Sequence, residues 1–444
     1  MLPVGPFDKR TFIRRCNACR RRKIKCVGAT PCEYCQKTRQ FCFRDAVAKP
    51  NALVFVSSGL QAPTSWSRQK TTNRGEIQSA SLSTSDDWVI AYFFEQFLKT
   101  NNFADGLWTH VTSHLHQLLH TSPALRSAIT AVAILDSSRR PSSRSNIPHL
   151  TAQEKALQIY SNSLTALQSA ICTYGAAEHT IWATFFLGLF ELMMGSNSTN
   201  WDRHFLYGTS NLLRARGPAT FRQGSGKVLF LTLRFFEVSR CLIYDESSFL
   251  MESAWSCLLA ALREESGVNR CLSEAVFDVM LRCSDLCSRL LNSTSESPSD
   301  FDGFMEEGAC LRVVTEMLLR DCRKPDPKSP DDLAAFVFLH ATSIYLSGIF
   351  DRRLHLFSTT PSAILSPDRV GIHVASILNG TEAAIDQTRL CGLLFLYPLR
   401  VAAARAATSP EQKRIADTFA KIGQQGFAIV RVFQEEITEV WSQG

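Results

Sequence analysis

Six cysteines near the start of the chain have the residue type and the spacing that metal chemistry requires. They follow the pattern C-x2-C-x6-C-x5-C-x2-C-x6-C, in which one C-x2-C-x6-C unit occurs twice with five residues between the copies. The residues are Cys16, Cys19, Cys26, Cys32, Cys35 and Cys42. Cysteine thiolates at such short spacings are typical ligands of structural zinc. Because this internal symmetry is hard to attribute to chance, the pattern predicts a metal-binding segment.

The number of cysteines predicts how many ions they hold. Zinc prefers four thiolates in a tetrahedron, so one ion would leave two of the six cysteines unused, whereas two ions require that two sulfur atoms be shared. The twofold symmetry of the spacing favours the first cysteine of each copy, Cys16 and Cys32, as the shared ligands. One ion would then bind Cys16, Cys19, Cys26 and Cys32, and the other would bind Cys32, Cys35, Cys42 and Cys16. We expect two Zn2+ ions as cofactors, because about thirty residues cannot build a hydrophobic core.

Disulfide bonds are the alternative use of these cysteines, and they require an oxidising compartment. The basic residues near the N-terminus are followed by no apolar stretch of the kind that a secretory signal has. The longest apolar run, "IWATFFLGLFELMMG", has 15 residues with Glu191 inside it, whereas a membrane-spanning helix needs about 20. We therefore expect a soluble intracellular protein with no membrane contact, in which the thiols stay reduced.

Positive charge is concentrated around the cysteines. Residues 9–44 contain twelve Lys and Arg and one acidic residue, Glu33, which gives this segment a net charge of +11. The whole chain carries +7, so the remainder is net negative. This asymmetry indicates a polyanion as the partner of one end of the chain. A basic run such as "CRRRKIKC" (19–26) is also typical of a nuclear localisation signal.

The six-cysteine segment resembles the fungal binuclear zinc cluster DNA-binding domain. Beyond the cysteines, "CRRRKIKC" is similar to the family's basic stretch between the second and third cysteines. Pro31 resembles the loop proline before the fourth cysteine, although it directly precedes Cys32 where several members have one residue between. The resemblance implies a sequence-specific DNA-binding transcription factor of the nucleus. Because most of the family activates, it favours an activator of RNA polymerase II genes that works with the transcription machinery.

The same resemblance assigns roles to the basic side chains. Each C-x2-C is expected to begin a short helical turn, and such modules place a helix in the major groove of double-stranded DNA, where Arg and Lys read O6 and N7 of guanine. Arg22 and Lys23 match the family's base-reading pair, which faces a CGG triplet, and Arg22 stands where other members carry Lys. The positions expected to bind phosphates are Arg20, Arg21, Lys25, Lys37 and Arg39.

The composition of the rest of the sequence predicts the domains that follow the cysteine-rich segment. We expect a small metal-stapled binuclear zinc cluster domain at 10–45, a disordered flexible linker at 46–85 and a large all-α regulatory domain at 86–444. Ser and Thr make up twelve of the 29 residues from 57 to 85, a composition that cannot bury enough apolar surface to fold. From Asp86 onward apolar residues recur at helical spacing, and alternating strand-length runs are scarce.

Several helix boundaries can be predicted from local signals. "TAQE" (151–154) has the form of a capping box, Gly195 can end the apolar stripe 182–193, and Gly217 with Pro218 can end another helix. Residues 135–148 are rich in Ser, Arg and Pro and predict a loop. The first stripe contains Val89, Ile90, Phe93, Phe94 and Phe97, and further stripes run over 228–243, 249–262, 270–291, 309–320, 333–350, 370–398 and 411–441.

A second resemblance covers residues 150–220. "YSNSLTALQSAI", "FFLGLFELMMG" and "WDRHFLYGTSNLLRARGP" are similar to the fungal-specific helical regulatory domain that often follows a zinc cluster. This resemblance implies one all-α domain over most of 86–444.

No pattern in the helical region indicates an enzyme. "HVTSHLHQLLH" brings His110, His114, His116 and His120 close together, but no carboxylate or cysteine nearby completes a metal site, so a polar helix face is the better interpretation. "GSGK" (224–227) lacks the flanking residues of a phosphate-binding loop. The nine cysteines outside the zinc pattern are expected to be small buried apolar residues.

The sequence also allows a second function for the cysteine-rich segment, and it bears on where the chain could dimerise. A zinc-stapled module that binds protein and never DNA would also use the six cysteines, although the basic segment argues against it. Residues 43–85 lack the apolar heptads of a coiled coil, so we expect any homodimer to form through the helical domain.

Overall fold

The computed structural model describes residues 33–38, 83–103, 108–140, 149–195, 207–266, 271–293, 301–322, 329–357 and 359–443. The chain forms two compact units, Met1–Ala62 and Pro63–Gly444. In the first unit the described element is a short helix, α2 (Glu33–Lys37). The predicted linker 46–85 lies outside the described residues except for its last three positions.

The described elements of the second unit are all helices, and we call α3 to α18 the helical domain. Its elements are α3 (Ser83–Tyr92), the π-helical η2 (Phe93–Phe97), α4 (Leu98–Thr100), α5 (Trp108–Thr121), α6 (Pro123–Arg139), α7 (His149–Tyr174), α8 (Glu178–Met194), α9 (Thr209–Arg216), η4 (Pro218–Phe221), α10 (Gly224–Tyr244), η5 (Phe249–Met251), α11 (Ser253–Ser266), α12 (Cys271–Asn292), α13 (Asp302–Asp321), α14 (Pro330–Asp351), η8 (Leu354–Leu356), α15 (Pro367–Gln387), η9 (Gly392–Phe395), α16 (Leu396–Ala403), α17 (Ser409–Gln424) and α18 (Val430–Gln443).

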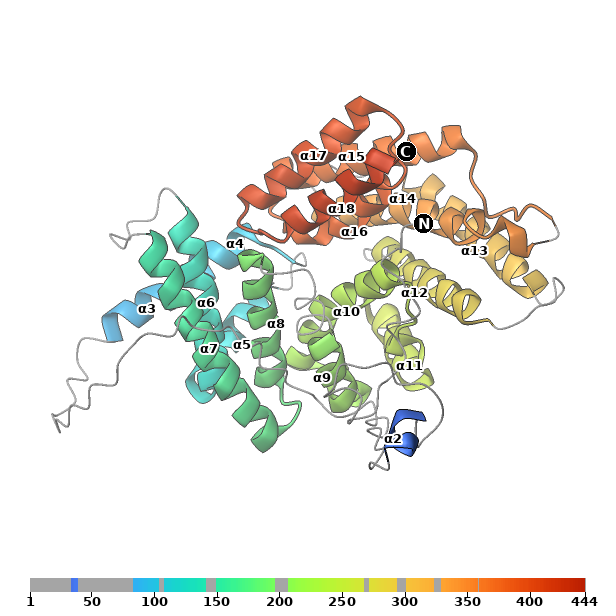
Figure 1. Ribbon diagram of the computed structural model, residues 1–444. Helices are drawn as coiled ribbons and strands as arrows, with labels where there is room; N and C mark the ends of the chain where they lie inside the picture. Colours follow the sequence, from blue (N-terminus) through green and yellow to red (C-terminus); the bar gives the residue numbers. More distant parts are fainter. Residues whose placement is uncertain are drawn as a thin grey trace. The chain divides into compact units, whose positions relative to one another are not determined.

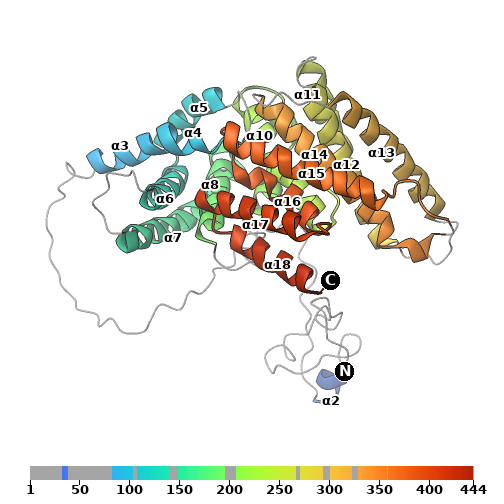
Figure 2. The same cartoon turned by 90° about the horizontal axis from the view of Figure 1, so that it is seen from above.

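Two helices organise the domain. α6 packs against α3, α5, α7 and α8, and α14 packs against α12, α13, α15 and α16. α10 contacts α8 as well as α12 and α16, so it connects the two groups. Figures 1 and 2 both show α3 to α8 gathered on one side of the domain and α14 to α18 stacked together. The prediction of a large all-α domain is therefore confirmed.

A serine followed by a proline begins three of the main helices. The hydroxyl of Ser122 accepts a hydrogen bond from the backbone N–H of Leu125 at 3.3 Å, and Pro123 occupies the first turn of α6. Ser329 and Ser366 cap α14 and α15 in the same way. Each serine satisfies one of the backbone donors that a helix start leaves unpaired, and proline lacks the donor that would have been unpaired there.

Aromatic side chains form the centre of the α3–α8 group. Phe93 and Phe97 stack with ring centroids 5.3 Å apart, and Phe93 meets Phe186 of α8 edge-to-face at 5.1 Å. Trp182 stacks on Phe186 with ring centroids 5.7 Å apart. The predicted stripe is thus confirmed, because Val89, Ile90, Phe93, Phe94 and Phe97 are all buried.

Helix α14 has the length and hydropathy of a membrane span, yet it is a core helix. Within its most apolar 18-residue window, 83% of the residues are buried by the rest of the domain. Because protein already covers this surface, the helix has no apolar face left for lipid. With 22 residues, α14 is longer than the run 181–195, which is the longest apolar run named in the sequence analysis.

Some predicted boundaries are wrong. "TAQE" lies inside α7, which begins two residues earlier at His149, and the first helix begins at Ser83 instead of Asp86. The stripe 370–398 contains most of α15, a short break that includes an isolated β-bridge at Leu390, η9 and the start of α16. The predicted loop 135–148 is helical as far as Arg139, and residues 141–148 lie outside the described part.

Other boundaries agree with the sequence. Gly195 ends α8 with a left-handed backbone (φ 64°), a conformation that glycine adopts without steric cost. Gly217, with φ 81°, ends α9 directly before Pro218.

Gly380 of α15 is required where α15 crosses α14. A Cβ atom at this position would lie 2.6 Å from Cγ2 of Val337. We predict that Gly380→Ala lowers the free energy of unfolding, because overpacking costs about 1–3 kcal/mol and exceeds the roughly 0.5–1 kcal/mol gained by replacing a helical glycine. Urea unfolding of the full chain measures this change.

Gly371→Ala is the matched control on the same helix. A Cβ atom there meets nothing within 4 Å, so this substitution should stabilise the chain. Equal effects of the two substitutions would contradict the packing argument.

Candidate functional site

Helix α2 contains the two predicted site residues that the structure describes. It begins directly after Cys32, the first cysteine of the second C-x2-C pair. It contains Cys35, the second cysteine of that pair, and Lys37. The Cys35 side chain is 1% exposed, whereas Lys37 is exposed. The predicted helical turn is therefore present in the second copy of the cysteine unit.

The other predicted site residues lie outside the described residues, and their placement stays a prediction. They are the cysteines Cys16, Cys19, Cys26, Cys32 and Cys42 and the basic residues Arg20, Arg21, Arg22, Lys23, Lys25 and Arg39. Among the described residues, no group of three or more His, Cys, Asp or Glu side chains is arranged to hold a metal ion.

Two of the α5 histidines contact neighbouring elements. His116 and His120 are exposed, and the ring of His116 stacks on Phe94 with centroids 3.8 Å apart. Nε2 of His114 lies 2.9 Å from a carboxylate oxygen of Glu178. These contacts tie α5 to η2 and α8.

The prediction that the remaining cysteines are buried holds for five of the eight whose side chains are described. These five are Cys241, Cys283, Cys287, Cys322 and Cys391. Burial raises the pKa of the Cys283 thiol to about 12 and that of Cys287 to about 11, so neither is a reactive thiolate near neutral pH. The prediction is wrong for Cys172, Cys257 and Cys310, which are exposed.

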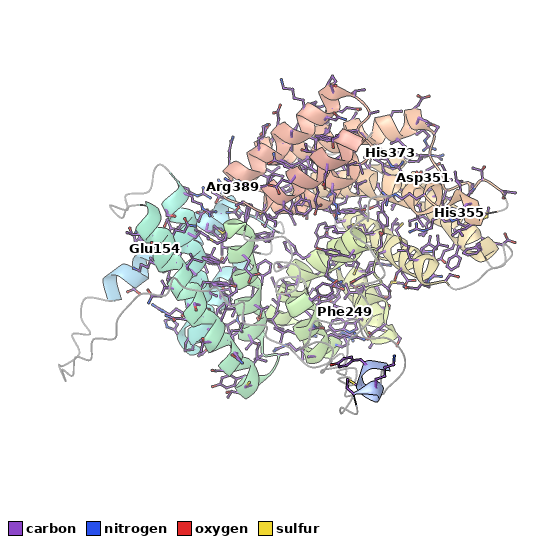
Figure 3. The ribbon with its side chains drawn as sticks, in the orientation of Figure 1. Glu154, Phe249, Asp351, His355, His373 and Arg389 are labelled. Carbon is purple, nitrogen blue, oxygen red and sulfur yellow. The ribbon has the colours of Figure 1, made fainter. Side chains whose placement is uncertain are left out.

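A chain of polar side chains crosses the packed layer between α13, α14 and α15. Nδ1 of His340 lies 2.7 Å from Nδ1 of His373, and Nε2 of His373 lies 3.2 Å from the hydroxyl of Ser343. All three are buried, and Figure 3 labels His373. The serine and histidine are arranged as in a nucleophile–base pair, so this cluster is the described site that most resembles a catalytic one.

The surroundings of the Ser343–His373 pair exclude a catalytic role. Burial lowers the pKa of His340 to about 4, and burial together with His340 and Arg312 lowers the pKa of His373 to about 3, so neither is an effective base near neutral pH. The hydroxyl of Ser343 accepts a hydrogen bond from the guanidinium of Arg312 at 2.6 Å. Arg312 also donates two hydrogen bonds to the backbone oxygen of Ala363, at 3.0 and 2.6 Å, and so joins α13 to the segment before α15.

A second buried network joins α9, α10 and the turn after α10. The Glu237 carboxylate accepts hydrogen bonds from Ser210, from Arg240 at 3.0 and 3.1 Å, and from Ser248 at 2.7 Å. Burial opposes ionisation of Glu237, but the Arg240 charge and these hydrogen bonds outweigh burial and hold its pKa below the usual value. Since its partners satisfy the carboxylate, this network is structural.

The family of the chain follows from its helical region. Residues 90–443 match the family described as the fungal specific transcription factor domain. The chain belongs to this family. The match covers η2 to α18 and the end of α3, and it does not include the cysteine-rich segment.

Membership in the fungal specific transcription factor family gives the helical domain a role in transcription regulation, and hence a nuclear one. The family is not enzymatic, which confirms the prediction and agrees with the enclosed Ser343–His373 pair.

Other comparisons add little to this assignment. An uncharacterized protein of Emericella nidulans is 26% identical over 102 residues, which is 22% of this chain and 22% of that protein. The aligned region therefore spans well under two thirds of the relative. No solved structure matches the chain.

The histidine pair should make the stability of the chain depend on pH. Both folded-state pKa values lie below the ordinary 6.5, so below that pH the unfolded chain binds more protons and the free energy of unfolding falls. Between pH 7 and pH 5 we expect a loss of about 2 kcal/mol per histidine. The double variant His340→Gln/His373→Gln should lose this part of the pH dependence in urea unfolding.

His355→Gln is the control, because His355 is exposed on η8 (Figure 3). It should keep the pH dependence of the original chain. An unchanged pH dependence in the double variant would contradict the assignment.

Proposed function

We propose that the chain is a sequence-specific DNA-binding transcription factor that reads CGG-type triplets through a binuclear zinc cluster at its N-terminus. The observation that carries this proposal is the combination in one chain of the C-x2-C-x6-C repeat with a helical domain of the fungal specific transcription factor family. The strongly basic charge of residues 9–44 supports a polyanionic partner.

Two Zn2+ ions would supply the rigidity that so short a segment lacks. Cys16 and Cys32 would bridge the ions, and Cys19, Cys26, Cys35 and Cys42 would complete the two ligand sets. In α2, Cys35 is buried while Lys37, two residues later, is exposed. This arrangement fits a segment that directs thiols inward and positive charge outward.

The basic residues divide into two roles. Arg22 and Lys23 would donate hydrogen bonds to guanine and so determine sequence preference. The residues that would hold the DNA backbone are Arg20, Arg21, Lys25, Lys37 and Arg39. Contacts to phosphate add affinity and salt dependence without sequence information.

Assembly and regulation belong to the helical domain. We place any homodimer contact there, because residues 43–85 lack apolar heptads. In the nucleus the domain would connect DNA binding to the transcription machinery, with activation as the expected outcome.

The two roles can be separated by substitution. We expect Lys23→Ala to weaken binding to a CGG probe by about 1–3 kcal/mol and to relax the preference within the triplet, whereas Lys37→Ala should weaken all probes alike. Gel-shift titrations of the full chain with CGG-containing and scrambled probes measure both effects, and sedimentation of the same complexes gives the number of chains per probe.

Unchanged affinity and preference in Lys23→Ala would show that this residue does not read a base. If the full chain binds neither probe, the DNA-binding proposal is wrong. The alternative, a zinc-stapled module that binds protein, is then favoured.

A further inference from the structure

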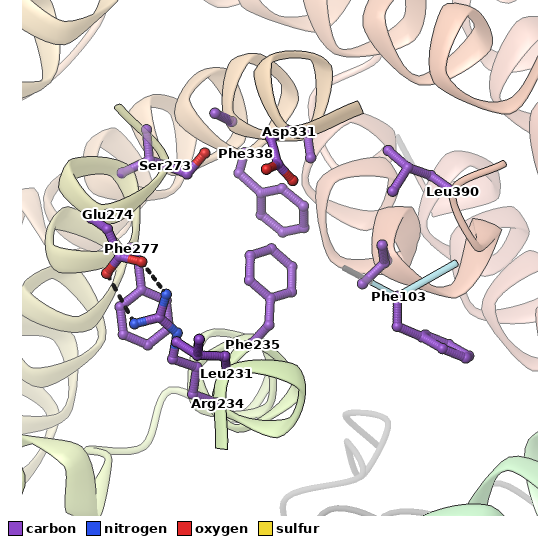
Figure 4. Close-up of a pocket in the computed structure, with 14 residues that line it drawn as sticks. Phe103, Leu231, Arg234, Phe235, Ser273, Glu274, Phe277, Asp331, Phe338 and Leu390 are labelled. Atoms are coloured by element: carbon purple, nitrogen blue, oxygen red, sulfur yellow. Dashed lines mark hydrogen bonds and ion pairs between the residues drawn. The ribbon is translucent and has the colours of Figure 1, made fainter. Parts of the chain in front are cut away.

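A cavity of about 110 Å³ lies in the helical domain where five chain segments meet (Figure 4). Helices α10, α12 and α14 line it, together with Phe103 after α4 and the stretch 390–394 after α15. Its charged residues already have partners, because Arg234 donates two hydrogen bonds to Glu274 and Asp331 has an interaction of its own. No charged group is left in this cavity to select a ligand, and the outer face of α13 is more informative.

The exposed side chains of α13 follow a single line along the helix. α13 packs on α12 and α14, and Figure 2 shows it along the outer edge of the helical domain. From residue 303 to residue 320 the exposed positions are spaced by 3, 4, 3, 4 and 3 residues, which keeps them on one side of the helix. We call them the α13 stripe, and they are Gly303, Glu306, Cys310, Val313, Met317 and Arg320.

The middle of the α13 stripe is apolar. Val313 is 59% exposed and Met317 is 57% exposed, and the neighbouring Cys310 is exposed as well. The solvent side of an amphipathic helix is ordinarily charged or polar. Three consecutive stripe positions without charge therefore leave apolar surface that a partner would cover.

The two ends of the α13 stripe carry opposite charges. Glu306 lies near the start of the helix and Arg320 lies in its last turn. In the part of the chain that the structure describes, neither side chain has an ion pair or a hydrogen bond with another side chain. The two residues lie about 21 Å apart along the helix axis, at 1.5 Å per residue, so they cannot pair within one chain.

An antiparallel contact with a second copy of this chain suits both features. In a twofold symmetric contact the same patch serves both copies, so residue i meets residue j and residue j meets residue i. With the two α13 helices antiparallel, Cys310 of each copy faces Val313 of the other. Glu306 of each copy then lies within reach of Arg320 of the other. A Cβ atom at Gly303 would meet nothing within 4 Å, so this position leaves space for the long side chain of Arg320.

We propose that a second copy of this chain binds along the α13 stripe, with the two helices antiparallel, their apolar centres in contact and Glu306 of each copy paired with Arg320 of the other. The proposal specifies the homodimer contact that the proposed function places in the helical domain. It can fail while DNA binding succeeds, because no part of the contact involves DNA.

The size of the contact sets its strength. α13 has 20 residues and is therefore about 30 Å long, and two such helices alone form an interface smaller than the standard size of about 1,600 Å². We therefore expect a weak dimer that dissociates at micromolar concentration. Binding of both chains to one DNA molecule would raise their effective concentration and strengthen the dimer.

The acidic residues beside the α13 stripe differ in their partners. Glu307 forms an ion pair with Arg289 at 2.7 Å, and Glu316 forms one with Arg369 at 2.8 Å, so both bring little charge to the contact. Asp321 is exposed at the end of α13 and would repel the acidic start of α13 in the second copy. Asp321→Asn should therefore tighten the dimer.

Sedimentation equilibrium of the full chain without DNA tests the proposal. We expect a monomer–dimer equilibrium in the micromolar range. Glu306→Lys and Arg320→Glu should each raise the dissociation constant about tenfold, because every substitution acts twice in a symmetric pair. The double variant Glu306→Lys/Arg320→Glu exchanges the charges and should restore the dimer. A monomer throughout the micromolar range, or a double variant no tighter than the single ones, would overturn the proposal.

A matched pair of substitutions tests the apolar centre of the stripe. Val313→Asp places two like charges near the twofold axis and should abolish the dimer. Val440→Asp is the control, because Val440 is 55% exposed on α18, and it should leave the dimer intact. Equal effects of the two substitutions on the dissociation constant would show that the contact does not lie along α13 and would contradict the proposal.

Discussion

Burial of α14 on every side is the constraint on which the helical domain depends. α12, α13, α15 and α16 all pack on this helix, so their positions are set by its surface. Close approach requires glycine at two contacts: a Cβ atom at Gly380 would meet Val337, and a Cβ atom at Gly308 of α13 would lie 2.3 Å from a ring carbon of Phe350. Because protein interiors are close-packed, each neighbour of α14 has little freedom to shift alone.

The polar residues of this helix are tolerated because each finds a partner. The hydroxyl of Thr342 donates to the backbone oxygen of Phe338 at 2.7 Å, and that of Ser347 accepts from the N–H of Leu365 at 2.9 Å. Ser343 accepts from Arg312. A buried polar group without such a partner costs about 1–3 kcal/mol. The bonds of Ser343 and Ser347 also fix how α13 and the segment before α15 lie on α14.

Local signals in the sequence predict much of the helical domain but not its internal sites. The first aromatic stripe and the helix ends at Gly195 and Gly217 are correct because spacing and glycine act within a few residues. The Ser-Pro starts at 329 and 366 are equally local and would have given two further boundaries. The polar cluster, in contrast, joins residues about thirty positions apart, and five segments line the cavity. Such sites depend on tertiary packing, which periodicity does not encode. The proposed zinc site of the N-terminal segment differs in kind, because it is inferred from short spacings that can be read directly in the sequence.

The most direct test of the account is the number of zinc ions that the full chain binds. Native mass spectrometry of the zinc-saturated protein should show two ions per chain. Cys16→Ser should lose both ions, since this residue is assigned as a bridge, whereas Cys19→Ser should keep one. One zinc ion per chain at saturation, or equal losses in the two variants, would contradict the shared-thiolate cluster on which the proposed function rests.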